Sequence, residues 1–365
     1  ILLVWPNRRA NKSRMRICFL DRSTKLDTVD DLQTKPRGGM VSSLFKVSDY
    51  LSKQGHDVWV ISDIKEPGFT KSGTRWVDYY PDDVVDFLIC NRGICGFNIK
   101  AKHRILWTHD LPHAGHIPEP QNIKAFSATV FMSEYAEKIW RNFYRDIGSS
   151  CLIPNGVDKD IFYPRQKDLD YLIFASAPNR GLKRLPFIFD CIESRIKRPV
   201  YMRAYSNLKK LHPGEVDPEI RNEEEDGFSI IYNRVAESKV ELLDPVPQQK
   251  LAEELGKAGL MILPTDYPEI CSNVILQSLA SGTPVITTGN LGSAGETVRH
   301  GKNGMLTKWL PVDYMIYQVD LIRNVVKVLE DERLHRKLIK NAANTKIYSW
   351  DETGEKWERL LTKIM

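Results

Sequence analysis

The segment from residue 268 to residue 288, PEICSNVILQSLASGTPVITT, places one acidic residue and a row of small polar residues in front of an apolar helix. The apolar stripe that predicts the helix consists of Val274, Ile275, Leu279 and Ala280. A helix that begins with Cys271, Ser272 and Asn273 presents its first backbone N–H groups, and the positive end of its dipole, to whatever lies outside. The segment therefore predicts an anion site, and phosphate is the obvious anion.

The same segment resembles the donor-site signature of the retaining GT-B glycosyltransferases of family 4, which are related to sucrose, trehalose-phosphate and glycogen synthases. In that signature a glutamate, seven residues and a second glutamate precede A-x-G-x-P-V, and this chain has Glu269 first and Gln277 second. The resemblance implies that Glu269 lies near the transferred sugar and that residue 277 holds the ribose hydroxyls. Gln277 can still bond a hydroxyl, but without the strength that a charge adds. The donor-binding residues implied at the start of the helix are Ile270, Cys271, Ser272 and Asn273.

Two basic residues resemble the cationic motif of that family, K/R-G-x3-L. Arg180 precedes a glycine and follows an expected strand at 171–175. Many members of the family carry a further arginine some residues earlier, where this chain has Ala-Ser, so the resemblance implies that Arg180 and Lys183 contact the donor diphosphate. For Lys183, a solvated basic loop remains an alternative.

Three other segments match the family in order and spacing. They are residues 153–158, IPNGVD, where the chain is expected to enter its second domain; residues 243–249, LDPVPQQ, whose backbone near Val246 is expected to meet the nucleotide base; and residues 292–304, GSAGETVRHGKNG, after the donor helix. Ordinary turn chemistry would explain the first segment alone. The combination makes the resemblance specific, above all in the second half of the chain.

The first half of the chain has the pattern of a matching lobe. A short apolar strand is expected at 15–20, a helix after Gly38 and Gly39, and a second strand at 58–61. A glycine pair lets backbone approach a ligand closely, and the resemblance implies that this pair faces the donor diphosphate, although a lone turn would explain it equally well. The chain lacks G-x-G-x-x-G with an acid about 20 residues on, which argues against a dinucleotide dehydrogenase.

Histidines cluster in the loop after an expected strand that ends at Trp107. Their spacing could suit a metal, but an intervening proline and glycine prevent a helix face with aligned ligands, so we expect no metal site. The resemblance implies that His109 approaches the sugar, with Asp110 as its orienting acid, and the expected catalytic residues are then Glu269, His109 and Arg180. The other two histidines, expected on the acceptor side or in a structural role, are His113 and His116.

Length and composition favour two domains. With 365 residues, 42% of them hydrophobic, the chain can form two cores. No apolar run approaches the roughly 18 residues of a membrane span, and no secretory signal is recognisable. The six cysteines show no metal-type pairs and suit a reducing cytosol. We therefore expect a cytoplasmic protein, and the absence of an initial methionine suggests a piece of a larger polypeptide.

A basic arm, residues 1–14, precedes the expected first lobe. The five basic residues that equal the formal net charge of +5 are Arg8, Arg9, Lys12, Arg14 and Arg16. Such an arm can attract anionic lipid headgroups at roughly 1 kcal/mol per residue, which predicts peripheral membrane contact and a lipid-linked acceptor. A solvated linker to an upstream domain is an equal alternative. Nucleic acid is not expected, because the arm lacks interleaved aromatic residues.

The expected architecture is a GT-B fold of the α/β class, with two Rossmann-like domains that face each other across a cleft. We expect the basic arm at 1–14, an acceptor domain at 15–153, a nucleotide-sugar donor domain at 154–348, and a helix at 349–365 that packs back on the first domain. The expected reaction moves a sugar from a nucleoside diphosphate sugar to a hydroxyl of a glycan or lipid-linked acceptor, with retained anomeric configuration and without a metal or other cofactor.

Two other functions of the same fold remain open. One is a nucleotide-sugar epimerase, which would change the sugar without an acceptor. The other is a catalytically weak partner module, which Gln277 and the missing first arginine would suit. The base of the donor, whether uridine, guanosine or adenosine, also stays open at this point, as do its sugar and the acceptor.

Overall fold

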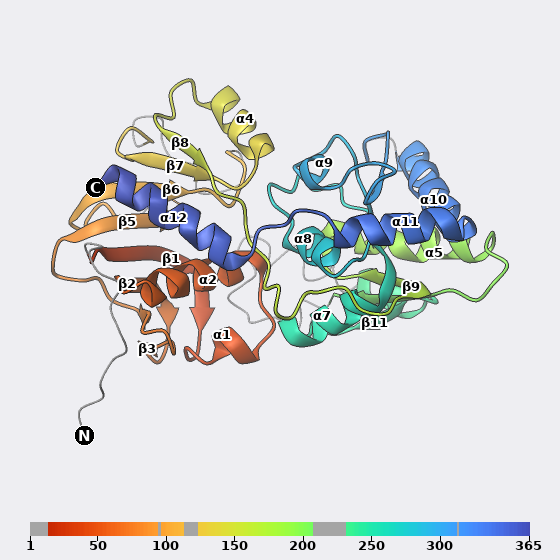
Figure 1. Ribbon diagram of the computed structural model, residues 1–365, viewed down its shortest axis with the longest axis horizontal. Helices are drawn as coiled ribbons and strands as arrows, with labels where there is room; N and C mark the ends of the chain where they lie inside the picture. The colour runs from red at the N-terminus through yellow and green to blue at the C-terminus, as the bar shows by residue number, and fades with distance from the viewer. Residues whose placement is uncertain (1–13, 94–95, 113–122, 207–230, 312–313) are drawn as a thin grey trace.

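The computed structural model describes residues 14–93, 96–112, 123–206, 231–311 and 314–365, and these form two lobes side by side (Figure 1). The first lobe contains an eight-stranded sheet in the order β3-β4-β2-β1-β5-β6-β7-β8. Its strands are β1 (Arg16–Leu26), β2 (Asp57–Ile64), β3 (Gly68–Phe69), β4 (Arg75–Val77), β5 (Val85–Asn91), β6 (Ala101–Trp107), β7 (Ala128–Phe131) and β8 (Ser150–Leu152). Its helices are α1 (Asp31–Thr34), α2 (Gly39–Lys53) and α4 (Glu134–Phe143).

The second lobe is built on a six-stranded parallel sheet in the order β11-β10-β9-β12-β13-β14. Its strands are β9 (Asp168–Phe174), β10 (Tyr201–Tyr205), β11 (Glu241–Leu243), β12 (Ala258–Leu263), β13 (Val285–Thr287) and β14 (Gly304–Leu306). Its helices are α5 (Leu185–Glu193), α7 (Gln248–Lys257), α8 (Asn273–Ala280), α9 (Ala294–Thr297), α10 (Tyr314–Glu330) and α11 (Glu332–Ala343), with 3-10 turns η1 (Pro178–Arg180) and η2 (Leu182–Arg184). The last helix of the chain is α12 (Trp350–Ile364).

The central strands have helices on both sides, which explains their continuous apolar sequences. All six residues of β12 and all three of β13 are buried. Among the strand pairs described in the first lobe, only the short β3–β4 pair is antiparallel. The strand expected at 15–20 extends to Leu26, because pairing with β2 resumes after an irregularity between Leu20 and Lys25. Two lobes with parallel sheets confirm the expected α/β class.

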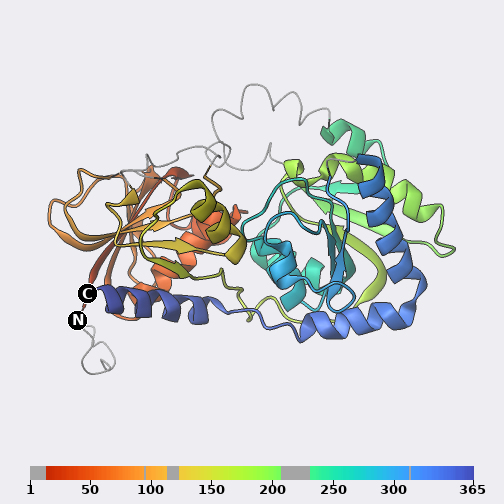
Figure 2. The same cartoon turned by 90° about the horizontal axis from the view of Figure 1, so that it is seen from above.

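The chain passes between the lobes twice. It leaves the first lobe through residues 153–158 and returns ahead of α12, where Val157 and Ser349 form a parallel bridge. From there α12 lies along the first lobe beside α2 (Figures 1 and 2). Trp357 of α12 is fully buried in that lobe, and its ring centroid lies 4.9 Å from that of Trp107. Burial of such an aromatic side chain holds the C-terminal helix on the first lobe.

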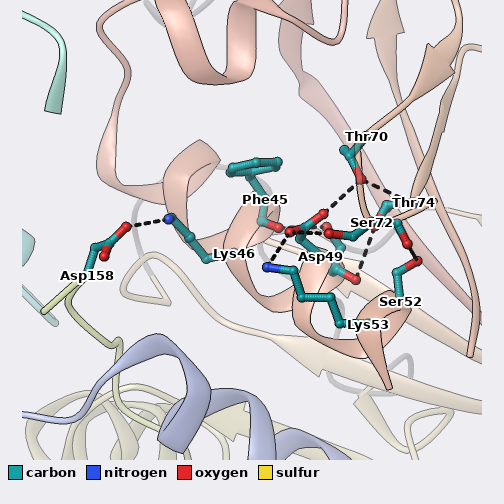
Figure 3. A network of polar contacts seen from close by, with 10 residues as sticks. Phe45, Lys46, Asp49, Ser52, Lys53, Thr70, Ser72, Thr74 and Asp158 are labelled. Atoms are coloured by element: carbon teal, nitrogen blue, oxygen red, sulfur yellow. Dashed lines mark hydrogen bonds and ion pairs between the residues drawn. The ribbon is translucent and has the colours of Figure 1, made fainter. Parts of the chain in front are cut away.

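Polar contacts along α2 fix this helix against its own sheet and against the hinge (Figure 3). The buried carboxylate of Asp49 accepts hydrogen bonds from Thr70 Oγ1 at 2.8 Å and from Ser72 Oγ at 2.9 Å, both in the loop between β3 and β4. Lys46 forms an ion pair of 2.7 Å with Asp158 of the hinge. The buried carboxylate is thereby satisfied, and these contacts hold the second half of α2 against its own sheet and the hinge.

Some expectations from the sequence fall outside the described residues. They concern the basic arm up to residue 13 and the two histidines of the loop after β6, His113 and His116. In the part of the chain that the structure describes, no helix is both long enough and apolar enough to span a membrane.

Gly354 lets α12 approach α2, and we expect an alanine there to destabilise the protein. A Cβ at Gly354 would lie 2.2 Å from Cγ of Tyr50, whereas a Cβ at Gly295 in α9 would meet no atom within 4 Å. Alanine favours a helix by about 1 kcal/mol over glycine, but overpacking typically costs about 1–3 kcal/mol. Denaturant titration should therefore show a lower free energy of unfolding for Gly354→Ala and an equal or higher one for Gly295→Ala. Equal values for the two variants would contradict this packing.

Candidate active site

Arg180 and Glu269 form an ion pair at one edge of the second sheet. Arg180 follows β9 and Glu269 follows β12, and these two strands are neighbours, so their carboxyl ends bring the two side chains together. Nε of Arg180 donates to Oε1 of Glu269 at 2.5 Å. The guanidinium carbon also lies 3.6 Å from the centroid of the Tyr267 ring, a cation–π contact. With side-chain exposures of 18% and 19%, the pair is shielded but still accessible to a ligand.

Two glycines allow the loops around this pair to approach each other. Gly181 has a φ of 102°, and a Cβ on it would lie 2.2 Å from the carbonyl oxygen of Pro264. Gly292 has a φ of 70°, and a Cβ on it would lie 2.5 Å from the carbonyl oxygen of Glu269. Only glycine tolerates both the left-handed backbone and the lack of space. The glycines of the two motifs therefore position the arginine and the glutamate.

Asn273, the first residue of α8, connects the second lobe to the first lobe and to the hinge. Its Nδ2 donates to the carbonyl oxygen of Gly39 at 3.1 Å, and its Oδ1 accepts a hydrogen bond from Nδ2 of Asn155 at 2.8 Å. A Cβ on Gly39 would lie 2.7 Å from Nδ2 of Asn273, so the contact depends on a glycine at that position. No side chain of the described residues caps α8, which leaves its first N–H groups available to an anion.

Two side chains just ahead of α8, those of Ile270 and Cys271, are held by contacts within the protein. Ile270 is buried in the core of the first lobe. The thiol of Cys271 accepts the backbone N–H of Asn155, and burial raises its pKa to about 12, so it stays neutral. Ser272 is the N-cap residue of α8. An anion at this point would therefore meet backbone groups of Ile270 and Cys271, not their side chains.

Gln277 lies one turn further along α8 and pairs with the start of α7. Its Nε2 donates to Oε1 of Gln248 at 2.7 Å. Gln248 belongs to the segment 243–249 that is expected to meet the nucleotide base, and Val246 of that segment packs partly against the core of the second lobe. The structure thus brings residue 277 to this segment and leaves its carbonyl oxygen as an acceptor for a hydroxyl group.

On the first lobe, His109 and Asp110 follow β6, and Arg92 follows the adjacent strand β5. Nε of Arg92 donates to Oδ2 of Asp110 at 2.5 Å. The carboxylate expected to orient His109 is therefore engaged by Arg92 instead, a pairing between neighbouring strand ends that the sequence does not reveal. The His109 ring lies 4.6 Å from the Trp107 ring, and its Nε2 is buried without a hydrogen-bond partner among the described residues. Burial, and to a smaller extent Arg92, lowers the pKa of His109 to about 3, so the imidazole is neutral.

Tyr267 marks the point where the two halves of the site meet. Burial raises the pKa of its hydroxyl, and the charges of Arg180 and Glu269 in its own lobe also affect this pKa. The charges of Asp110 and Arg92 in the first lobe affect it as well. Two ion pairs, one from each lobe, therefore lie close enough to Tyr267 for their charges to affect its hydroxyl. Arg92 has a φ of 73°, a conformation that residues other than glycine rarely adopt and that often occurs at functional sites.

The remaining expected residues are placed as follows. Gly38 is the N-cap residue of α2. Lys183 lies in η2, is exposed, and forms no hydrogen bond or ion pair with the described residues. The sequence analysis gave no role to Arg92 and Tyr267, which the structure places here, and named Asn155 and Gln248 only as parts of the segments 153–158 and 243–249. Within the described ranges no three His, Cys, Asp or Glu side chains come together as metal ligands.

Comparison with known proteins agrees with this architecture. Residues 207–324 match the model of the family Glycosyl transferases group 1. Over 127 residues the chain is 29% identical to an exopolysaccharide phosphotransferase of Streptomyces coelicolor. The aligned stretch covers 34% of this chain but only 13% of the length of that relative. Sucrose-phosphate synthase of Thermosynechococcus elongatus has a similar structure, with a TM-score of 0.72 at 16% identity over 96% of this chain and 99% of that chain.

A second solved structure, HepE of Anabaena in complex with UDP and glucose, has a TM-score of 0.67 at 14% identity, over 96% of this chain and all of that chain (100%). These likenesses confirm the expected GT-B fold. The chain thus carries a glycosyl transferases group 1 domain within a GT-B architecture.

The partly buried, neutral imidazole of His109 has a consequence for stability at low pH. Its pKa of about 3 lies below the ordinary value of 6.5, so between these values the folded state binds fewer protons than the unfolded state. The free energy of unfolding must then fall as pH falls through this range. We expect His109→Asn to lose less stability than the parent between about pH 7 and about pH 4 in denaturant titrations, because it lacks this group. The same pH dependence in both proteins would show that His109 is not held neutral by the fold.

Proposed function

We propose that the chain is a retaining glycosyltransferase that moves a sugar from a nucleoside diphosphate sugar to an acceptor hydroxyl in glycan or glycolipid synthesis. The observation that carries this proposal is the Arg180–Glu269 pair beside the start of α8. A cation next to a helix N-terminus suits a diphosphate, and the adjacent carboxylate suits the sugar attached to it. UDP and glucose, the parts of one such donor, are bound in the HepE structure.

The chemical demand of this reaction falls on the leaving group. As the bond between sugar and diphosphate breaks, negative charge grows on the diphosphate oxygen. Only Nε of Arg180 is engaged by a carboxylate of the described residues, so its terminal nitrogens can bind phosphate oxygens. The N–H groups of residues 271–273 add the fixed dipole of the helix start. Such preorganised donors stabilise developing charge without reorganisation during the reaction.

The opposite charge develops on the sugar, whose transition state resembles an oxocarbenium ion. Glu269, held in place by Arg180, supplies a negative charge on that side of the site. His109 contributes from the first lobe: a neutral imidazole has one donor and one acceptor nitrogen, and its buried Nε2 can bond a sugar hydroxyl. The proton of the acceptor hydroxyl passes to an oxygen of the departing diphosphate, so the reaction needs no separate base.

Positive charge from Arg180 and from the start of α8 stabilises the leaving diphosphate, as a divalent cation does in other transferases. We therefore propose a reaction without a metal or other cofactor. The acceptor is a glycan or a lipid-linked saccharide. The basic arm provides peripheral contact with an anionic membrane surface that carries such an acceptor.

A panel of UDP-, GDP- and ADP-sugars, each with and without an oligosaccharide acceptor and all in the presence of a chelator, tests this function. We expect release of one nucleoside diphosphate that depends on the acceptor, and a product whose anomeric proton in NMR shows the configuration of the donor. Glu269→Gln keeps the shape of the side chain but removes its charge, and should lower turnover about 100-fold or more at unchanged thermal stability.

Several outcomes of the panel would contradict the proposal. Inverted product, or full loss of activity in the chelator with recovery on adding a divalent ion, would overturn the mechanism. A changed sugar in the absence of acceptor would indicate the epimerase, and nucleotide binding without turnover would indicate the partner module. Unchanged turnover in Glu269→Gln would remove Glu269 from the site.

Binding measurements separate the role of Arg180 from a structural one. Arg180→Ala should weaken the binding of a nucleoside diphosphate by about 1.5–3 kcal/mol, the contribution of a hydrogen bond to a charged group. This corresponds to a dissociation constant about 10- to 150-fold higher. Binding of the matching nucleoside should change little, because it lacks the phosphates. Arg333→Ala, on the exposed face of α11, removes the same charge away from the site and serves as the control. Equal losses for the nucleoside and its diphosphate would show that Arg180 only supports the fold.

A further inference from the structure

A cavity of about 610 Å³ lies at the hinge, where the two chain crossings meet α4 and α9. It shares the start of α8 with the candidate active site, because Cys271 and Ser272 line it, and the two spaces diverge along the rest of the helix. Ser272, Ile275 and Leu276, on one face of α8, line the cavity. Asn273 and Gln277, on the adjacent face, instead contact Gly39 and Gln248. The cavity is therefore a different space from the one that Arg180 and Glu269 border.

Basic residues outnumber acidic residues in the lining of this cavity. The basic residues that line it are Arg299, Lys302, Lys346 and Lys356. None of the four forms an ion pair within the described part of the chain. The ammonium groups of Lys346 and Lys356 lie 6.0 and 4.7 Å from the ring of Tyr348, which gives them one common aromatic neighbour. Arg299, Lys302 and Lys346 are exposed and Lys356 is partly buried, and an anion bound among the four would lower their mutual repulsion.

Two carboxylates also line the cavity, but one of them is already engaged. Glu296 accepts hydrogen bonds from the backbone N–H groups of Glu134 at 3.1 Å and Tyr135 at 2.7 Å, at the start of α4. The second acid is Glu134, whose side chain is exposed. Four cations and two carboxylates leave an excess of two positive charges. A phosphate monoester, with a charge of about −1.5 to −2 at neutral pH, matches this excess.

The cavity also offers acceptors for hydroxyl groups. Asn341 and Asn344 line it, and each uses its side-chain nitrogen for a backbone carbonyl, that of Lys302 and that of Lys340. Their side-chain carbonyl oxygens have no hydrogen-bond donor within the described residues, so they can accept from a ligand. The lysines can bind a phosphate group, and the amide oxygens can accept hydrogen bonds from hydroxyl groups. This combination suits a phosphorylated sugar. A volume of about 610 Å³ is in the range of small-molecule sites.

We propose that the hinge cavity binds a small sugar phosphate at a site separate from the active site. Its walls come from both lobes and from both chain crossings: Ser133 belongs to the first lobe, Lys302 to the second, Pro154 to the first crossing and Lys346 to the second. A ligand that contacts all of these parts binds one relative placement of the lobes better than another. Occupancy of the cavity therefore shifts the equilibrium between lobe arrangements and modulates activity at the cleft.

Calorimetric titration with glucose 6-phosphate, inorganic phosphate and glucose tests the site. We expect glucose 6-phosphate to bind, inorganic phosphate to bind more weakly, and glucose not to bind. The titrations are repeated with the best-binding of UDP, GDP and ADP at saturation, and the sugar phosphate should still bind. In the double variant Lys302→Gln/Lys346→Gln its affinity should be about tenfold or more lower, as expected for lost charged hydrogen bonds.

The matched control is Lys327→Gln/Lys337→Gln, which removes two exposed lysines of α10 and α11 outside the cavity. It should bind the sugar phosphate like the parent, and thermal unfolding should show that both double variants are folded. Competition between glucose 6-phosphate and the nucleoside diphosphate would place the sugar phosphate in the active site and overturn the proposal. Equal affinity in the two double variants, or no binding by the parent, would overturn it as well. None of these results depends on transferase turnover, so they test the cavity separately from the proposed function.

Discussion

The contact of Asn273 with Gly39 is the constraint on which the rest of the site depends. One amide side chain at the start of α8 bonds the first residue of α2 and also Asn155 of the hinge. It therefore fixes a helix N-terminus of the second lobe against the first lobe. Because an amide offers both donors and an acceptor, asparagine can make both contacts at once. The anion-binding end of α8 is thus defined by both lobes together.

Other contacts maintain this placement from either side. Ile270, which precedes α8, is buried in the core of the first lobe, although it belongs to a loop of the second lobe. The C-terminal helix buries Trp357 in the first lobe, so the chain is tied down on both sides of the hinge. Within this frame the Arg180–Glu269 pair and the Arg92–Asp110 pair lie around Tyr267. Charged groups that are preorganised in this way suit a reaction in which charges separate.

The sequence allowed the fold class and the main loops to be predicted, because these depend on local patterns. The β-branched run at Val285–Thr287 and the apolar stripe of α8 are of this kind. The stripe was predicted too narrowly: Leu276 and Ser278 are buried as well, since α8 packs against both α7 and α11. A helix with two packing partners buries a wider face than one amphipathic stripe.

What the sequence could not provide was the pairing of groups that are distant in the chain. Arg92 follows a buried strand, which is a weak signal of function. Its bond to Asp110, which takes that carboxylate from its expected role beside His109, depends on how two strand ends turn. The position of Tyr267 under the guanidinium of Arg180 likewise depends on the loop between β12 and α8. Spacing along a sequence carries no information about such contacts.

The central claim is that both lobes form one nucleotide site, and hydrogen–deuterium exchange on binding of a nucleoside diphosphate tests it most directly. With the best-binding of UDP, GDP and ADP, the account predicts slower exchange in residues 267–276 of the second lobe. It predicts slower exchange at the same ligand concentrations in the first turn of α2, after Gly39, and around His109 of the first lobe. Slower exchange confined to the second lobe would contradict the account, because the first lobe would then take no part in binding the nucleotide.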